Sequence, residues 1–323
     1  MKKLDKLILK KNKETILFTP GPGSLLKENI SGIRPCFGRN DNIYSKIEKY
    51  VLNKITKISG QKKTIALQGS GSLAIEIMCL NFLQGNVTII KTGYYSDRLN
   101  FICKQLKKIK RIKNLDVVSW KNLNEIKKNT DWIFYCPTET SIGLYLPIKA
   151  IWKIAVKNKS KLMLDATASI GLEKDHGYAH ALSFSSCKGL FGLTGAAFIS
   201  YKVKPRYYKN SFYLNLYNHE NKKMTGPYHT ICSLYNVLKK YNEIKYSVLI
   251  NKKIFMKKMK DKLFFPLKNQ PKLCTRVNSE IKSKTKNVIL YKSRAKIKGS
   301  VVNHLGELHL KKKAKGNILN LIN

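Results

Sequence analysis

The chain has little negative charge and no long apolar run. Only 19 of its 323 residues are acidic, against 62 basic ones, which gives a formal net charge of +43. No apolar stretch approaches the ~20 residues that a membrane-spanning helix requires, so we expect no membrane partner. The first ten residues are charged too often to supply the apolar part of a signal peptide. The lack of a membrane-spanning segment and the lack of a signal peptide favour a cytoplasmic protein.

Arginine is scarce among the basic residues. Seven of the 62 basic residues are arginines, and the rest are lysines spread from Lys2 to Lys315. Proteins that recognise nucleic acid use arginine for bidentate contacts and gather charge on one face. We therefore interpret the lysines as solvated surface positions and expect no specific nucleic-acid partner. Because a charge of +43 still attracts polyanions at low salt, a polyanion-binding protein with an inert fold remains an alternative.

Paired cysteines are missing as well. The seven cysteines are odd in number, include no Cys-x-x-Cys pair and lie mostly in apolar segments, which indicates reduced, buried thiols in the cytoplasm. His176 and His180 could place two metal ligands on one helix face, but Asp175 is the only third candidate nearby. We expect no metal site.

Short apolar segments alternate with amphipathic ones from about residue 45 to residue 200. Six of them predict strands, at residues 64–67, 87–91, 132–136, 161–164, 181–184 and 196–200. Helices are expected from a capping box at Ser45 and Glu48 to Gly60, and at 72–83, 97–108 and 147–157. This alternation predicts an α/β fold with a mostly parallel sheet covered on both faces. Ligands bind such sheets at the carboxyl ends of the strands.

Ser70, Gly71 and Ser72 follow the first of these strands and open a helix. Backbone N–H groups and the positive end of a helix favour an anion there, phosphate above all. A dinucleotide site is a weaker alternative, because the acid expected about 20 residues later to bind ribose is missing. A purely structural glycine turn is a third interpretation.

Lys188 lies between two strand segments and is followed by glycines at 189, 192 and 195, which allow tight turns. Asp165 ends the 161–164 strand, where a carboxylate needs a cationic partner or serves as a turn or cap residue. Tyr95 could stack on a planar ring, and Thr140 adds a hydroxyl at the same edge of the sheet. A phosphate cradle, a lysine, an acid and an aromatic side chain on one rim together indicate a site for pyridoxal 5'-phosphate.

The order of these motifs resembles the class V aminotransferases of fold type I. The matching segments, in order, are residues 19–22, 67–72, 93–98, 139–143, 164–166, 185–188 with Gly192 and Gly195, 225–229 and 303–307. The resemblance implies a large cofactor-binding domain over residues 1–240 and a small C-terminal α+β domain over 241–323. Residues 1–45 would contribute to the small domain or to a dimer interface.

The resemblance also implies roles for individual residues. Lys188 would bind pyridoxal phosphate covalently and carry a proton between substrate and cofactor, and Asp165 would keep the pyridine nitrogen protonated. The residues implied to bind the cofactor are Ser70, Gly71, Ser72, Tyr95, Thr140, Asp165, Lys188 and Thr225. Of these, Thr225 would reach the phosphate of the other subunit of a homodimer.

Within this family the motifs are most similar to those of the aminotransferases that act on 2-aminoethylphosphonate and pyruvate. The expected reaction therefore moves an amino group from a small amine such as 2-aminoethylphosphonate to a 2-oxo acid such as pyruvate. Alanine:glyoxylate or serine:pyruvate amino transfer and a divergent lyase are alternatives. A lyase of the desulfurase type would need a mobile cysteine, for which Cys274 is the most exposed candidate.

Three positions depart from the family pattern. Cys187 replaces an amide residue before the lysine, Tyr228 replaces a threonine, and Val301 replaces the arginine that grips the α-carboxylate of the substrate. A valine cannot make that bidentate contact. Three explanations are open: a nearby cation takes over the role, the substrate lacks a carboxylate there, or the protein is a divergent lyase or has lost transamination. The candidate cations are Arg294, Lys296 and Lys298.

Overall fold

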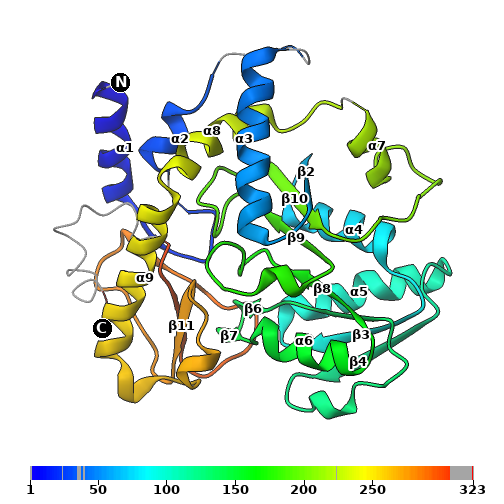
Figure 1. The fold of residues 1–323 in the computed structure, drawn as a ribbon. Coiled ribbons are helices and arrows are strands. Elements are labelled where there is room, and N and C mark those ends of the chain that lie inside the picture. Colours follow the sequence, from blue (N-terminus) through cyan, green and yellow to red (C-terminus); the bar gives the residue numbers. More distant parts are fainter. Residues whose placement is uncertain are drawn as a thin grey trace.

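The computed structural model describes residues 2–23, 25–34, 38, 41–222, 224–305 and 322 (Figure 1). Its centre is a seven-stranded sheet with the strand order β2-β10-β9-β8-β5-β3-β4. The strands are β2 (Lys63–Gln68), β3 (Asn86–Lys91), β4 (Asn114–Ser119), β5 (Trp132–Tyr135), β8 (Lys161–Asp165), β9 (Ala181–Ser185) and β10 (Ala196–Tyr201). Four of the six neighbouring pairs are parallel, while β10 is antiparallel to both β2 and β9. The expected α/β fold with a mostly parallel sheet is confirmed.

All six predicted strands are present, and the sequence missed one. The missed strand, β4, lies at the edge of the sheet and keeps most of its residues partly or fully exposed. A half-exposed strand carries a mixed sequence, here Asn-Leu-Asp-Val-Val-Ser, because only part of it meets the core. Its weak apolar pattern explains why it was not predicted.

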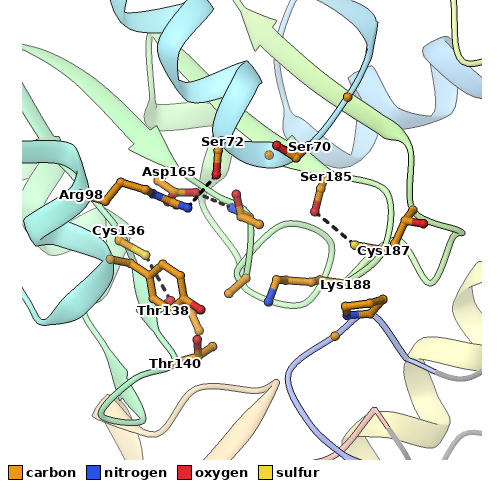
Figure 2. A pocket seen from close by; sticks show the side chains of 18 of the residues that line it. Ser70, Ser72, Arg98, Cys136, Thr138, Thr140, Asp165, Ser185, Cys187 and Lys188 are labelled. Carbon is orange, nitrogen blue, oxygen red and sulfur yellow. Dashed lines mark hydrogen bonds and ion pairs between the residues drawn. The ribbon is translucent and has the colours of Figure 1, made fainter. Parts of the chain in front are cut away.

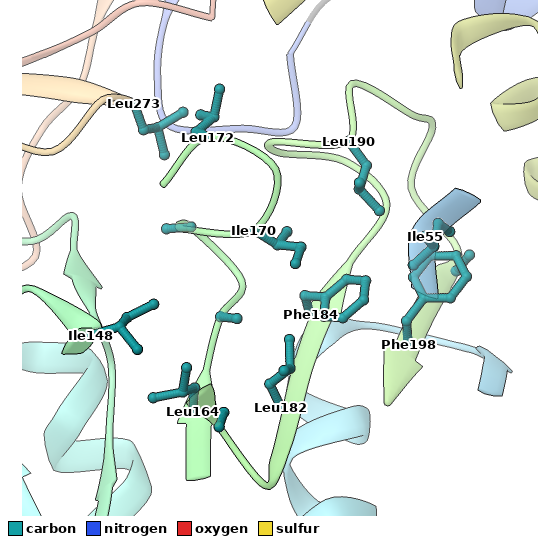
Figure 3. Packing of buried hydrophobic residues seen from close by; sticks show 14 of the residues in the cluster. Ile55, Ile148, Leu164, Ile170, Leu172, Leu182, Phe184, Leu190, Phe198 and Leu273 are labelled. Atoms are coloured by element: carbon teal, nitrogen blue, oxygen red, sulfur yellow. The ribbon is translucent and has the colours of Figure 1, made fainter. Parts of the chain in front are cut away.

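Helices cover both faces of the sheet. They are α3 (Asn42–Ser59), α4 (Gly71–Phe82), α5 (Tyr94–Lys108), α6 (Ile148–Lys157) and α8 (Tyr228–Lys239). Helices α3, α6 and α8 belong to one buried cluster, and α4 and α5 to another. Neighbouring residues of β10 alternate between the clusters, Phe198 in the first and Ala197 and Ile199 in the second, because strand side chains point to opposite faces. Figure 3 shows Phe198 beside Ile55 and Phe184, with the two phenylalanine ring centroids 5.5 Å apart.

The predicted start of helix α3 was wrong. The residue that caps it is Asp41, whose side chain accepts a hydrogen bond from the backbone N–H of Tyr44 at 2.6 Å. Ser45 lies one turn inside, where its hydroxyl donates to the Asp41 carbonyl. The cap residue therefore lies four residues before Ser45, and the helix ends as expected at Gly60.

Segments from both ends of the chain pack beside the main sheet. Strand β1 (Ile16–Phe18) pairs in parallel with β12 (Val288–Leu290), and β11 (Cys274–Val277) pairs antiparallel with β13 (Ser300–Asn303). Helix α9 (Tyr241–Lys258) lies next to β11 (Figure 1). Its Phe255 packs with buried residues of β1, β11, β12 and β13 in a small hydrophobic core. The division of the chain at residue 240 stays a prediction.

The remaining short elements are α1 (Lys2–Glu14), α2 (Lys27–Ser31), α7 (Leu216–Asn221), β6 (Thr138–Glu139) and β7 (Leu144–Tyr145). Within the described residues, every helix is too short or too polar to cross a membrane. Cys187 is half-buried and the other described cysteines are buried, without disulfides among them, while Cys36 lies outside the described residues.

Candidate functional site

A cavity of about 590 Å³ opens at the carboxyl ends of β5, β8 and β9. It lies where ligands bind open α/β sheets and has the size of a small-molecule site. Seven of the eight sequence-predicted site residues line it, namely Ser70, Gly71, Ser72, Tyr95, Thr140, Asp165 and Lys188. Figure 2 shows Lys188 pointing into this cavity, with Ser70 and Ser72 above it and Thr140 below. The structure thus brings together side chains that are more than 100 residues apart in sequence.

The N-terminus of α4 forms one wall of the cavity. Ser70 is the cap residue, and its side chain accepts a hydrogen bond from the N–H of Leu73 at 3.5 Å. The first backbone N–H groups of a helix have no partner within the helix, and they carry the positive end of its dipole. A Cβ atom added to Gly71 would lie only 3.2 Å from the hydroxyl of Thr167 and 3.5 Å from Cβ of Ser185. Glycine therefore keeps this cradle open for a phosphate-sized anion.

Asp165 is the buried carboxylate of the site, with 1% of its surface exposed. Its Oδ1 accepts the N–H of Thr167 at 3.1 Å, and its Oδ2 accepts a hydrogen bond from Arg98 at 3.0 Å. Arg98 also donates to the hydroxyl of Ser72 at 3.0 Å (Figure 2). A carboxylate offers about four acceptor positions, so Asp165 retains room for one more N–H donor.

The sequence analysis did not assign Arg98 to the site. Its guanidinium carbon lies 5.2 Å from the centre of the Tyr95 ring, within the range of a cation–π contact. The signal that could have found it is its spacing, because residues three apart on a helix share one face. Tyr95 and Arg98 both lie on α5 and both line the cavity.

Lys188 follows β9, and its Nζ donates a hydrogen bond to the Pro20 carbonyl at 3.3 Å. Burial lowers the pKa of this lysine, because a charged amine loses hydration, while the nearby Cys187 and Asp165 oppose the shift. The chain around Gly21 packs tightly over the lysine. A Cβ at Gly21 would lie 2.7 Å from the Cys187 carbonyl oxygen and 3.0 Å from Cγ of Lys188. A lowered pKa raises the share of neutral amine, which is the nucleophilic form of lysine.

Glu139 is a second residue that the sequence analysis did not assign. It is fully buried and accepts hydrogen bonds from the N–H groups of Tyr95 at 3.1 Å, Ser96 at 3.4 Å and Ser141 at 3.2 Å. Burial raises its pKa, while these hydrogen bonds oppose the shift. Glu139 therefore ties the N-terminus of α5 to the segment that carries Thr140. Burial raises the pKa of the Tyr95 hydroxyl, while the neighbouring Arg294 and Thr140 oppose the shift.

These residues fit pyridoxal phosphate. The α4 terminus suits its phosphate, the buried Asp165 suits a protonated pyridine nitrogen, and Lys188 suits its aldehyde. Two further hydroxyls that line the cavity, those of Thr138 and Thr167, are buried without a hydrogen-bond partner among the described residues. Because buried polar atoms in proteins are nearly always paired, these two favour a polar ligand in the cavity.

Thr225 is the one predicted site residue that lies elsewhere. It lines a second cavity of about 340 Å³ together with Tyr44, Gln68 and Tyr228. Within this chain it therefore does not contact the site that holds Lys188. The role implied for it, across a dimer interface, stays a prediction.

The structure narrows the choice among the candidate cations. Val301 is buried on β13, and its neighbour across the strand pair is Arg276. Of the three proposed replacements, only Arg294 belongs to the described lining of the cavity, and Lys296 and Lys298 do not.

Two weaker interpretations of the sequence were wrong. Cys274 is completely buried on β11, and burial raises its thiol pKa to about 12, so it is not an exposed persulfide carrier. His176 and His180 do not share a helix face. Nε2 of His176 bonds the hydroxyl of Ser169 at 2.9 Å, whereas Nδ1 of His180 accepts the N–H of Leu162 at 3.0 Å.

Sequence comparison finds known transaminases that are similar to this chain. No protein-family model matches the chain. It is 27% identical over 198 residues to a 2-aminoethylphosphonate–pyruvate transaminase of Pseudomonas aeruginosa, covering 57% of this chain and 53% of that protein. It is 24% identical over 281 residues to a bifunctional phosphonoacetaldehyde hydrolase/aminoethylphosphonate transaminase of Clostridioides difficile, covering 75% of this chain and 44% of that one.

Solved structures give the same result for the fold. An alanine–glyoxylate aminotransferase from Nostoc superposes with a TM-score of 0.80 at 15% identity, over 95% of this chain and 93% of that one. An aspartate aminotransferase from Thermus thermophilus gives 0.78 at 15% identity, over 94% and 97%. The chain is similar in sequence to these transaminases and shares the fold of the solved aminotransferases. It spans about half the length of the Pseudomonas transaminase and of the Clostridioides protein.

Proposed function

We propose that the chain is an aminotransferase that uses pyridoxal 5'-phosphate to move an amino group from a small amine to a 2-oxo acid. The observation that carries this proposal is that Lys188, Asp165 and the N-terminus of α4 converge on one cavity. The preferred pair is 2-aminoethylphosphonate and pyruvate, which the names of the sequence relatives support. Alanine with glyoxylate is the rival pair. The reduced, mostly buried cysteines support a cytoplasmic location.

The residues of the cavity would have different roles in this reaction. Pyridoxal phosphate, when bound, supplies an aldehyde and a ring that accepts electrons from the substrate carbon. Lys188 has the lowered pKa that lets its Nζ act as a nucleophile and then take up and return a proton. Asp165 would pair with the positive charge of a protonated pyridine nitrogen. Arg98 fixes the orientation of the Asp165 carboxylate. Tyr95 and Thr140 close the site against water from the side of α5.

A homodimer belongs to the same proposal. The second cavity, around Thr225 and Tyr228, is the surface that a partner subunit would complete. The test is the molar mass of the purified protein in light scattering. A monomer that has full activity would refute the homodimer and leave the proposal for Lys188 in place.

The central test is covalent labelling of Lys188. We expect the protein with pyridoxal phosphate to show a visible absorption band, which borohydride removes while fixing the cofactor on Lys188, as located by peptide mass spectrometry. Lys188→Ala should lose the band. Lys202→Ala is the matched control, because Lys202 also has a pKa lowered by burial but donates to the Gly177 carbonyl outside the cavity. A wild-type protein that takes up no cofactor would refute the proposal.

The donor and the acceptor are identified by separate half-reactions. The cofactor-loaded protein is mixed with 2-aminoethylphosphonate, alanine or serine, and loss of the visible band reports amino transfer. The aminated protein is then mixed with pyruvate or glyoxylate, and recovery of the band reports the acceptor. Alanine and glyoxylate reacting faster than 2-aminoethylphosphonate and pyruvate would establish the rival pair.

A further inference from the structure

Strand β13 does not offer a cation to the cavity. Val301 is 3% exposed, and its side chain packs below Gly143, where an added Cβ would lie 3.2 Å from the valine Cγ2. Arg276, which lies opposite Val301 in the strand pair, makes its contacts outside the cavity. Its guanidinium donates to the carbonyls of Ile142 at 3.2 Å and Lys298 at 3.4 Å, and lies 3.5 Å from the centre of the Phe264 ring.

Two arginines line the cavity within the described part of the chain, and one of them is already paired. Arg98 donates to both Asp165 and Ser72, as described above. The other is Arg294, which lies in the segment between β12 and β13 and is exposed to solvent. Its Nη1 donates to the Tyr94 hydroxyl at 3.3 Å, which uses one of the five N–H donors of a guanidinium.

The segment that carries Arg294 is fixed to the wall of the cavity. The Ser293 hydroxyl donates to the Ser141 carbonyl and accepts the N–H of Ala295 at 2.9 Å. Ser141 also accepts the N–H of Tyr94, at 3.3 Å, through its own hydroxyl. Arg294 is therefore held between the start of α5 and the segment that carries Thr140, and it lines the cavity there.

We infer that Arg294 binds the anionic group of the substrate at the mouth of the cavity. The planar fork of a guanidinium matches the oxygens of a carboxylate or a phosphonate, which accept two parallel hydrogen bonds from it. The substrates are therefore small amines and 2-oxo acids that carry one such group. This inference rests on the proposed function and adds the residue that selects the substrate.

Net charge alone provides a competing explanation, because a chain of +43 attracts any small anion. The same segment offers matched controls. Lys292 and Lys296 lie two residues before and after Arg294 and are also exposed, but neither lines the cavity. Removing any of the three changes the net charge by one. Only Arg294→Gln removes a donor from the site.

The experiment measures binding of ethylphosphonate, which has the anionic group but no reactive amine, by calorimetry at 150 mM salt on the protein with pyridoxal phosphate. Arg294→Gln should weaken binding by about 10- to 100-fold, as expected for the loss of charge-assisted hydrogen bonds. Lys292→Gln and Lys296→Gln should change it by less than about 2-fold, since exposed charges are screened. Equal weakening in all three variants, or none in Arg294→Gln, would overturn the inference.

A second readout separates specificity from general damage. Arg294→Gln should slow the half-reaction with 2-aminoethylphosphonate while leaving the rate with ethylamine, which has no anionic group, within about 2-fold. Arg294→Lys keeps the charge without the fork and should fall between the wild type and the glutamine variant. If the wild type takes up no cofactor, the proposed function fails. If it takes up cofactor but Arg294→Gln binds ethylphosphonate as the wild type does, only the inference about Arg294 fails.

Discussion

Replacing Glu139 by glutamine tests whether a buried carboxylate positions the cofactor site. One oxygen of Glu139 accepts the N–H groups of Tyr95 and Ser96, and the other accepts both the N–H and the hydroxyl of Ser141. Glutamine keeps one acceptor, and its NH₂ group faces N–H donors with which it cannot bond. At least two hydrogen bonds to a charged group are lost, at ~1.5–3 kcal/mol each.

Glutamine also removes the free-energy cost of burying a charge, which is the reason that burial raises the pKa of Glu139. This gain offsets part of the loss. We therefore expect the free energy of unfolding of Glu139→Gln to fall by about 2–4 kcal/mol, measured by urea denaturation at pH 7. The control is Asp97→Asn, which removes a charge from the same helix N-terminus. Asp97 is exposed and pairs with an exposed lysine, Lys91, so its loss should cost less than about 1 kcal/mol. Equal effects from both variants would refute the argument from burial.

The same variant should weaken cofactor binding. Tyr95 and Arg98 lie in the first turns of α5, which Glu139 holds in place. A looser start of α5 should raise the apparent dissociation constant of pyridoxal phosphate by about 10-fold, or ~1.4 kcal/mol, read from the visible band during titration. A less stable variant with unchanged cofactor affinity would show that Glu139 supports the fold but does not position the site.

Three further predictions follow from single contacts. Arg98→Met, which leaves Asp165 buried without its ion pair, should lower the free energy of unfolding in urea by ~2–3 kcal/mol, and Arg98→Lys by less. Gly71→Ala should weaken cofactor binding about 10-fold in titration, because its Cβ would lie 3.2 Å from the Thr167 hydroxyl, which lines the cavity, and displace it. His176 stays neutral when buried, with a pKa lowered to about 3, so the unfolded chain binds more protons below pH ~6.5. The loss of stability between pH 7 and pH 5, measured by urea denaturation, should be about 2 kcal/mol smaller in His176→Gln than in the wild type.

The strands and the main site residues could be predicted because their signals are local. Each strand of the central sheet except β4 is an apolar run bounded by polar or glycine residues, and the cradle at Gly71 follows directly from a strand, a glycine turn and a helix. Lys188 was recognisable from the glycines after it, and Asp165 from its place at the end of a strand.

The missed residues depend on contacts between distant segments. Arg98 meets Asp165 across 67 positions, and Glu139 meets Tyr95 across 44, so neither contact follows from a local sequence pattern. Cys274 was expected to be exposed because charged residues flank it. In the fold, the amine of Lys272 donates to the Leu172 carbonyl, and Arg276 lies over Phe264, so both long side chains are accommodated beside a buried strand.

Arg98 connects the two ends of the proposed cofactor site. It binds Ser72 beside the phosphate cradle of α4 and Asp165 at the end of β8, while its own helix begins at the turn that Glu139 fixes. The contact with Arg98 fixes the orientation of the Asp165 carboxylate, which keeps an acceptor position for a protonated pyridine nitrogen. The same guanidinium fixes the distance between that carboxylate and the phosphate cradle. The spacing that a rigid cofactor requires is therefore set by α4, α5 and β8 together, before the cofactor binds.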